Sequence, residues 1–211
     1  MTSPAEKKLP RGRMTAAARR EQLIEIGRGL FATRGFDGTS IEEIAARAEV
    51  SKPVVYEHFG GKEGLYAVVV DREVRQLLDM MEASLTSGSP RALLEQAASA
   101  LLDYIEQSSD GFRILVRDSP IGSASGSFVS IIGDVASRVE HILVGEFKAR
   151  GFDAKAAPMY AQMLVGMVGT TGQWWLDARK PAKEVVAAHL VNLAWNGLSG
   201  LEQKPTLRLH P

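Results

Sequence analysis

Apolar residues recur along most of the chain at intervals of three and four positions, the spacing of one face of an α-helix. The pattern occurs in the segments 23–31, 41–48, 93–105, 128–143 and 186–201. No run alternates apolar and polar residues between turn residues, so no β-strand is predicted. The chain is therefore expected to be all-α, with about nine helices of ordinary globular length.

Prolines and glycines separate these segments. Pro90, Pro120, Pro158 and Pro181 lie between periodic stretches, where a residue without an N–H is tolerated near a helix start. Gly151 is expected to end the helix that precedes it. The first three helices are short and closely connected, whereas those after residue 61 are longer.

These helix lengths predict four parts. Residues 1–20 form a basic flexible arm, 21–61 a small three-helix domain, 62–86 one continuous linking helix, and 87–211 a larger helical domain. No longer repeat is present, which argues against a solenoid.

Composition narrows the functional classes. The chain has 211 residues, of which 45% are hydrophobic, and 25 basic residues balance 25 acidic ones. It contains no cysteine, which excludes disulfides, thiolate metal sites and cysteine nucleophiles and favours a cytoplasmic protein. Because the net charge is zero, any affinity for nucleic acid must come from local clustering of charge.

Such a cluster lies at the N-terminus. The cations there, set against Glu6 alone, are Lys7, Lys8, Arg11, Arg13, Arg19 and Arg20. No apolar run follows them, so the stretch is not a secretory signal. Two interpretations remain open for this arm: a solubilising tail, or a contact with a nucleic-acid backbone or minor groove.

The segment Gly35–Leu65, GFDGTSIEEIAARAEVSKPVVYEHFGGKEGL, carries signals for two short helices joined by a tight turn. Thr39 and Ser40 each precede a glutamate by three residues, the capping-box spacing at a helix start. Ser51 is expected to cap the next helix, with Pro53 in its first turn. Two short helices crossing through a short turn have helix-turn-helix geometry.

Two lysines stand at predicted helix N-termini. The helix dipole disfavours Lys52 and Lys62 there by about 0.3–1 kcal/mol at low salt. A polyanion docked against both helix starts would compensate, because free N–H groups and lysines would face the same phosphates. The alternative is that both lysines are exposed and screened.

The run G-F-x-G-T-S-x-x-x-I-A-x-x-A-x-V-S-K-x-x-x-Y-x-H-F-x-x-K-E-x-L resembles the DNA-binding region of TetR-type transcriptional regulators, with the match extending from Arg28 to Leu65. The resemblance implies that Ser51–Phe59 is a recognition helix lying in the major groove. Glu49 departs from the glycine usual in the family, and is mildly strained if the turn requires a positive φ. The rest of the chain resembles the family only in being helical and of similar size.

The resemblance also implies which residues contact DNA. Lys52, Pro53 and Val54 are expected to reach base edges, the lysine towards guanine and the other two against thymine methyl groups. Phosphate contacts are expected from Thr39 or Ser40, Tyr56, His58 and Lys62, and Ser51 joins this DNA-binding set at the start of the recognition helix. Tyr56 as a cover for the small core and His58 as an ordinary surface imidazole are the competing interpretations.

The larger domain shows no catalytic or metal-binding pattern. The segment Gly122–Gly126 has Ala124 where a nucleophile elbow needs serine, and no strand precedes it. His141, His189 and His210 are too far apart for a metal site. No enzyme activity, metal or cofactor is therefore expected.

A methionine stripe and aromatic residues suggest a ligand cavity in that domain. The candidate ligand-binding residues are Met81, Tyr104, Phe112, Arg113, Arg117, Phe128, Met163, Met167 and Trp174. Thioether and aromatic linings suit adaptable cavities, although such a stripe equally fits plain core. The two arginines, one turn apart, either hold an anionic head group or lie on a solvated face.

The segment Ala156–Leu176 lacks any charged residue. Its length would span a membrane, but glutamines, threonines and glycines dilute it, so a membrane partner is not expected. We predict instead that Ala156–Ala178 and Pro181–Leu201, the last two helices, form a four-helix interface between two copies of the chain.

The resemblance implies a ligand-responsive repressor that binds a pseudo-palindromic double-stranded DNA operator as a homodimer. The tracts GGKEGLYAVVVDREV, QWWLDARKP and HLVNLAWNGLSGLE resemble actinobacterial members tied to fatty-acid metabolism, so a fatty acyl-CoA is the expected effector. Two alternatives stay open: a small-molecule-binding or enzymatic helical protein whose N-terminal module contacts other proteins, and a DNA-binding dimer without a ligand.

Overall fold

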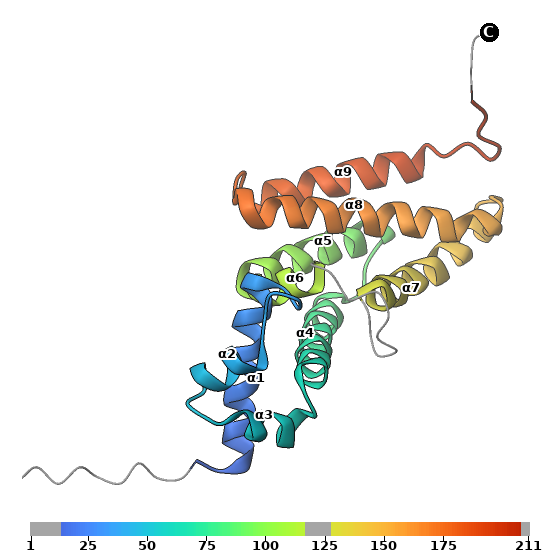
Figure 1. The fold of residues 1–211 in the computed structure, drawn as a ribbon. Coiled ribbons are helices and arrows are strands. Elements are labelled where there is room, and N and C mark those ends of the chain that lie inside the picture. The colour runs from blue at the N-terminus through green and yellow to red at the C-terminus, as the bar shows by residue number, and fades with distance from the viewer. Residues whose placement is uncertain (1–13, 117–127, 208–211) are drawn as a thin grey trace, which may run out of the picture.

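The computed structural model describes residues 14–116 and 128–207, and it confirms the all-α prediction (Figure 1). Nine α-helices and one short 3₁₀ turn, with no strand, make up the described ranges. The α-helices are α1 (Ala16–Arg34), α2 (Ile41–Arg47), α3 (Lys52–Phe59), α4 (Lys62–Ser84), α5 (Pro90–Gln107), α6 (Ser109–Val116), α7 (Phe128–Ala149), α8 (Ala157–Ala178) and α9 (Lys183–Ser199).

Helices α1, α2 and α3 form a small unit at one end of the molecule, here called the head (Figure 1). Its apolar positions meet in a shared core, where Leu23, Phe31, Ile44 and Val55 are almost completely buried. Burying such side chains contributes about 1.5–3 kcal/mol each. Helices α2 and α3, of 7 and 8 residues, are therefore held by packing and not by their own helical propensity. Helix α1 was also predicted to be short, but it has 19 residues.

Helix α4 leaves the head and runs into the larger part of the molecule, as the sequence predicted for residues 62–86. Its first turns belong to the head core through Leu65 and Tyr66, whose ring packs edge-on against Phe31. Gly27 on α1 allows this approach, because a Cβ there would lie 2.9 Å from Leu65. Motion of α4 and motion of the head are therefore coupled by direct packing.

Helices α5 to α9 form the larger domain. Helix α9 packs along α5, and α7 packs along α8, while α6 contacts both α1 of the head and α4. A second, smaller core lies between α7 and α8 around Leu143, Phe147, Ala157 and Ala161. The domain thus meets the head through α4 and α6 (Figure 1).

The basic arm is shorter than the predicted range 1–20, because α1 begins at Ala16 with Thr15 as its N-cap. Arg19 donates to the carbonyl of Ala48 at 3.2 Å, and the Arg20 guanidinium lies 5.0 Å from the centre of the Phe59 ring. Both arginines therefore belong to the head. Residues 1–13, which carry the other predicted arm cations, lie outside the described residues.

Candidate DNA-binding surface and larger domain

Helix α3, the expected recognition helix, presents its first turn to solvent. Ser51, Lys52 and Pro53 are exposed, whereas Val54 is half-buried and packs on the head core beside fully buried Val55. Ser51 occupies the N-cap position, but its hydroxyl makes no capping hydrogen bond, contrary to prediction. The start of α3 therefore offers an uncapped serine hydroxyl to an outside partner, whereas Pro53 has no N–H and the N–H of Val54 donates to the carbonyl of Ser51 at 3.1 Å.

The turn before α3 has the strained backbone that the sequence suggested. Glu49 adopts φ +54°, the left-handed region in which glycine is favoured. Its N–H donates to the carbonyl of Ala46 at 3.2 Å, and Val50 donates to Ala45 at 3.0 Å. The departure from glycine therefore leaves the helix-turn-helix geometry intact.

Lys52 and Lys62 already have partners within the chain. Lys52 forms an ion pair with Glu42 at the start of α2, and this contact lowers the pKa of Glu42. Lys62 donates to the carbonyl of Phe36 at 3.0 Å and lies 4.2 Å from the centre of its ring. Each lysine therefore has compensation within the chain, and a docked polyanion is not required to explain its place near a helix start.

The two candidate residues before α2 differ in accessibility. Ser40 is exposed and accepts a hydrogen bond from the N–H of Glu43 at 3.2 Å, confirming its predicted cap. Thr39 is only 2% exposed, and its hydroxyl donates to the carbonyl of Gly35 at 2.8 Å. The structure therefore contradicts a phosphate contact through the Thr39 side chain and leaves Ser40 as the candidate.

Tyr56 and His58 lie on the later turns of α3. Tyr56 is 53% exposed, which argues against the interpretation that its ring covers the core. His58 is half-buried, with its ring centre 6.0 Å from that of Phe59. Tyr56 is thus the better placed of the two for contact with DNA.

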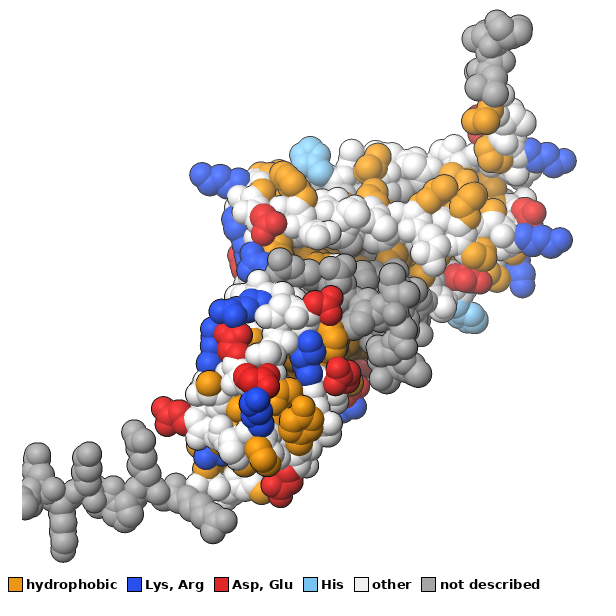
Figure 2. Space-filling view, in the orientation of Figure 1, with side chains coloured by type: hydrophobic (Ala, Val, Ile, Leu, Met, Phe, Trp, Pro, Cys, Tyr) orange, Lys and Arg blue, Asp and Glu red, His pale blue; other side chains and the backbone are white. Residues whose placement is uncertain are grey.

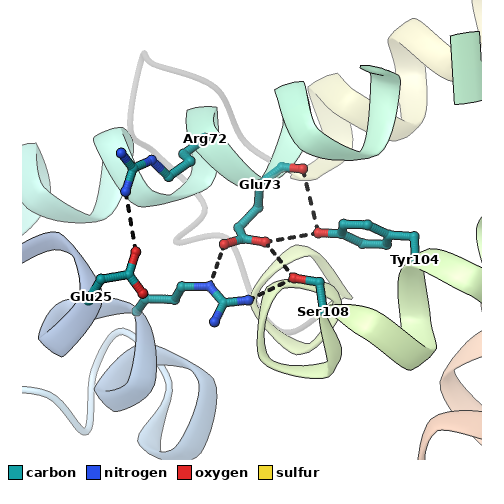
Figure 3. A network of polar contacts seen from close by, with 6 residues as sticks. Glu25, Arg72, Glu73, Tyr104 and Ser108 are labelled. Carbon is teal, nitrogen blue, oxygen red and sulfur yellow. Dashed lines mark hydrogen bonds and ion pairs between the residues drawn. The ribbon is translucent and has the colours of Figure 1, made fainter. Parts of the chain in front are cut away.

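A buried polar network joins the head to the rest of the chain, and the sequence reasoning missed it (Figure 3). Glu73 on α4 is 1% exposed, and its carboxylate accepts from Arg28 Nε on α1 at 2.5 Å. The same carboxylate accepts from the hydroxyls of Tyr104 at 3.0 Å and Ser108 at 3.2 Å. Arg28 also donates to Ser108 at 2.7 Å, so α1, α4 and the end of α5 meet at one carboxylate.

The electrostatics of this network follow from its burial. Burial and the neighbouring Glu73 carboxylate raise the pKa of Tyr104 above its usual range, so Tyr104 stays a neutral donor. Burial opposes the charge of Arg28, but the hydrogen bond and charge of Glu73 outweigh it and raise the pKa of Arg28. Arg28 is therefore a permanent cation facing a buried carboxylate.

The predicted ligand-binding residues meet only in part, and those that meet lie in packed core. Tyr104 and Phe112 are buried in the main core, Met81 is half-buried on α4, and Met167 packs partly against the core. Arg113 pairs with Asp177 at 3.2 Å in place of an anionic ligand. Arg117 and the side chain of Phe128 lie outside the described residues.

Met163 and Trp174 were predicted to line a cavity, but they are 55% and 54% exposed on α8. Other large apolar side chains exposed on the last two helices are Met159, Val185 and Leu193. Figure 2 shows hydrophobic side chains emerging along this α8–α9 layer. Their prediction as a ligand lining is wrong for a single chain, and their exposure fits a surface that another molecule covers.

One hollow of about 360 Å³ lies between the end of α4 and α5, around Ser84, Gln96 and Asp103. Another, of about 800 Å³, lies between α1 and α4, around Arg20 and Arg72. Neither is lined by a predicted ligand-binding residue.

Within the described ranges, no three His, Asp or Glu side chains are grouped closely enough to hold a metal ion. None of the described helices combines the length and apolar character needed to cross a membrane.

Comparison with known proteins places both parts of the chain in one group. Residues 23–69 match the family described as bacterial regulatory proteins, tetR family, and residues 90–197 match the tetracyclin repressor-like C-terminal domain. The transcriptional activator FasR of Mycolicibacterium smegmatis is 31% identical over 190 residues, covering 89% of this chain and 86% of the relative.

Further relatives agree with this grouping. A transcriptional repressor from Mycobacterium tuberculosis is 36% identical over 112 residues, which cover 48% of this chain and 56% of the relative. The crystal structure of a TetR-like transcriptional regulator from Rhodococcus sp. RHA1 matches with a TM-score of 0.73 and 26% identity, covering 90% of this chain and 100% of that one.

Proposed function

Since the chain belongs to the tetR family of bacterial regulatory proteins and is a DNA-binding transcriptional regulator, we propose that it binds a pseudo-palindromic operator as a homodimer. The observation that carries the proposal is the exposed first turn of α3, with Lys52 and Pro53 facing outward from a packed three-helix head. An operator lies on the chromosome, so we place the protein in the cytoplasm.

We propose a division of the head residues between base contacts and phosphate contacts. Lys52, Pro53 and Val54 read base edges, while Ser40, Ser51, Tyr56, His58 and Lys62 contact the phosphate backbone. To reach DNA, Lys52 exchanges Glu42 for a guanine acceptor, and Lys62 exchanges the Phe36 carbonyl for a phosphate. Both present contacts lie at the surface or near it, so the exchange needs no unfolding of the head.

The dimer is proposed to form through α8 and α9. Met163, Trp174 and Leu193 are more than half exposed there, and α8 carries no charged residue before Asp177. A second copy packed on this face would bury these side chains in a four-helix arrangement. In this proposal, residues 16–61 form the DNA-binding head, 62–86 form the linking helix, and 87–211 form the dimerisation and effector domain.

We propose a small apolar or amphiphilic effector bound among the helices of the larger domain, with a fatty acyl-CoA as the specific candidate. Support for the acyl-CoA comes from the resemblance of three sequence tracts to actinobacterial regulators tied to fatty-acid metabolism. Repression is the proposed sign, because a dimer seated in a promoter blocks polymerase. The relatives include both a named activator and a named repressor, so transcription in vitro from the chain's own promoter tests the sign.

Gel-shift analysis against the chain's own promoter fragment tests DNA binding. A discrete complex that survives excess unrelated DNA supports the proposal, and loss of all complexes to competitor contradicts it. Thermal melting with palmitoyl-CoA, with free coenzyme A as control, tests the effector. A midpoint that rises with palmitoyl-CoA concentration supports an acyl-CoA ligand, and an unchanged midpoint favours a dimer that responds to another compound or to none.

A further inference from the structure

The polar contacts between the head and the rest of the chain differ in burial. On the surface, Arg72 of α4 pairs with Glu21 at 2.6 Å and Glu25 at 3.3 Å, and all three side chains are exposed by 41% or more. Below them lies the buried network of Arg28 and Glu73 (Figure 3). Exposed pairs contribute little to stability, whereas a buried carboxylate requires its partner.

The geometry of Arg28 fixes α1 in direction as well as in distance. Its Nε donates to Glu73 on α4, and a terminal nitrogen of the same planar guanidinium donates to Ser108 at the end of α5. A planar guanidinium that binds two different helices resists rotation and sliding of α1 against them, because its hydrogen bonds are directional and apolar contacts are not. Among the described contacts of Glu73, the only cation comes from the head.

Gly111 shows how closely α6 is fitted to this network. A Cβ at this position would lie 1.7 Å from Glu73 Oε2 and 2.7 Å from Ser108 Oγ. Any side chain there would push on the oxygen that accepts from Tyr104 and Ser108, and would so move the carboxylate whose other oxygen accepts from Arg28. The glycine at this position is therefore part of the fit between α6 and the network.

From these contacts we infer that Arg28 and Glu73 are positioning residues that hold the DNA-binding head at one fixed orientation to the larger domain. The inference deepens the proposed regulator function and rests on it, because the orientation of the head sets where each recognition helix meets the operator. Tyr104 and Ser108 tie the same carboxylate to α5, the helix along which α9 packs.

The chain has no cysteine, so spin labels go only where cysteines are introduced. The variants Ala46→Cys, on the exposed face of α2, and Ser99→Cys, on the exposed face of α5, place one label on the head and one on the larger domain. Labelled protein diluted into excess unlabelled protein reports the distance within one chain by pulsed electron spin resonance. We expect one narrow distance distribution for this background.

Three sets of substitutions are then made in this doubly labelled background. The double variant Arg28→Met/Glu73→Met removes both charges, and Gly111→Ala displaces the carboxylate, so both are expected to lose the single narrow peak. Arg72→Met, which removes the exposed pair between the same two helices, is the matched control and is expected to keep it. Circular dichroism shows which variants are folded, and if one test variant does not fold, the other decides the test.

A narrow peak in a folded test variant, or equal broadening in Arg72→Met, would overturn the inference. Urea unfolding separates positioning from stability: the double variant is expected to recover most of the stability that Arg28→Met loses while its distance distribution still broadens. The distance is measured without DNA. A protein that failed to bind DNA would therefore refute the proposed function and leave the distance result standing.

Discussion

Removing Arg28 alone is expected to destabilise the protein strongly, because the Glu73 carboxylate would remain buried without its cation. Arg28→Met keeps the length of the side chain but leaves Glu73, which is 1% exposed, with the hydroxyls of Tyr104 and Ser108. Removing one partner of a buried ion pair costs about 3–5 kcal/mol.

The structure places the expected loss at the lower end of this range. The Arg28 side chain is 22% exposed, so part of the pair is screened, and the two hydroxyls still donate to the carboxylate. We therefore expect a loss of about 3 kcal/mol in the free energy of unfolding. For a chain of this length, that corresponds to a fall of about 6–12 °C in the melting midpoint.

Urea unfolding followed by circular dichroism, at one fixed protein concentration, measures the effect. The second change Glu73→Met removes the orphaned charge, so the double variant should regain about 2 kcal/mol of the loss. A loss below about 1 kcal/mol for Arg28→Met, or a double variant less stable than the single one, would refute this account of the network.

Three further predictions address DNA binding, assembly and pH. Lys62→Ala should weaken binding to all DNA sequences alike and lower the salt dependence of log K by about one per subunit, whereas Val54→Ala should mainly relax base preference. Binding titrations over a salt series distinguish the two variants. Altered base preference in Lys62→Ala would contradict the assignment. Leu193→Glu should yield folded monomers in sedimentation, while Ile142→Glu, equally exposed on α7, should not; a dimeric Leu193→Glu would refute the interface. Tyr104→Phe should have a lower free energy of unfolding than the parent near neutral pH, and this difference should shrink from about pH 9 to about pH 11. The reason is that a tyrosine whose pKa is raised by folding gives stability that is lost as pH rises above the pKa of tyrosine in the unfolded chain. Plots of unfolding free energy against pH that run parallel for the two proteins would contradict this.

The head was largely predictable from the sequence, because its signals are local. Ser40 caps α2, the linking helix begins at Lys62, and Glu49 has the positive φ that its place in the turn suggested. Two local details differ. Thr39 points into the core, and Ser51 makes no capping bond, because spacing alone does not tell which of two adjacent hydroxyls faces inward.

The network around Glu73 could not be predicted from periodicity. Glu73 lies in the charged run Asp71-Arg72-Glu73, where one carboxylate is exposed and the next almost completely buried. Which one is buried depends on α1 and α6, which are far away in the sequence. Gly111, inside a helix and directly before buried Phe112, was the available signal that a neighbouring group needs its space.

The methionine stripe of α8 shows another limit of sequence patterns. A regular apolar spacing identifies one face of a helix, but it does not tell whether that face packs inside the chain or on a second copy. Met163 and Trp174 were assigned to a cavity and lie on the surface, while Met167 of the same stripe packs partly against the core. The charge-free length of α8 is the sequence feature on which the proposed interface rests.

Selection of binding sites from a random double-stranded DNA library by the purified protein tests the central claim most directly. The account predicts an enriched pseudo-palindrome whose half-site centres are separated by whole helical turns of about 10–10.5 base pairs. Enrichment of no motif, or of single half-sites without a symmetric partner, would contradict it.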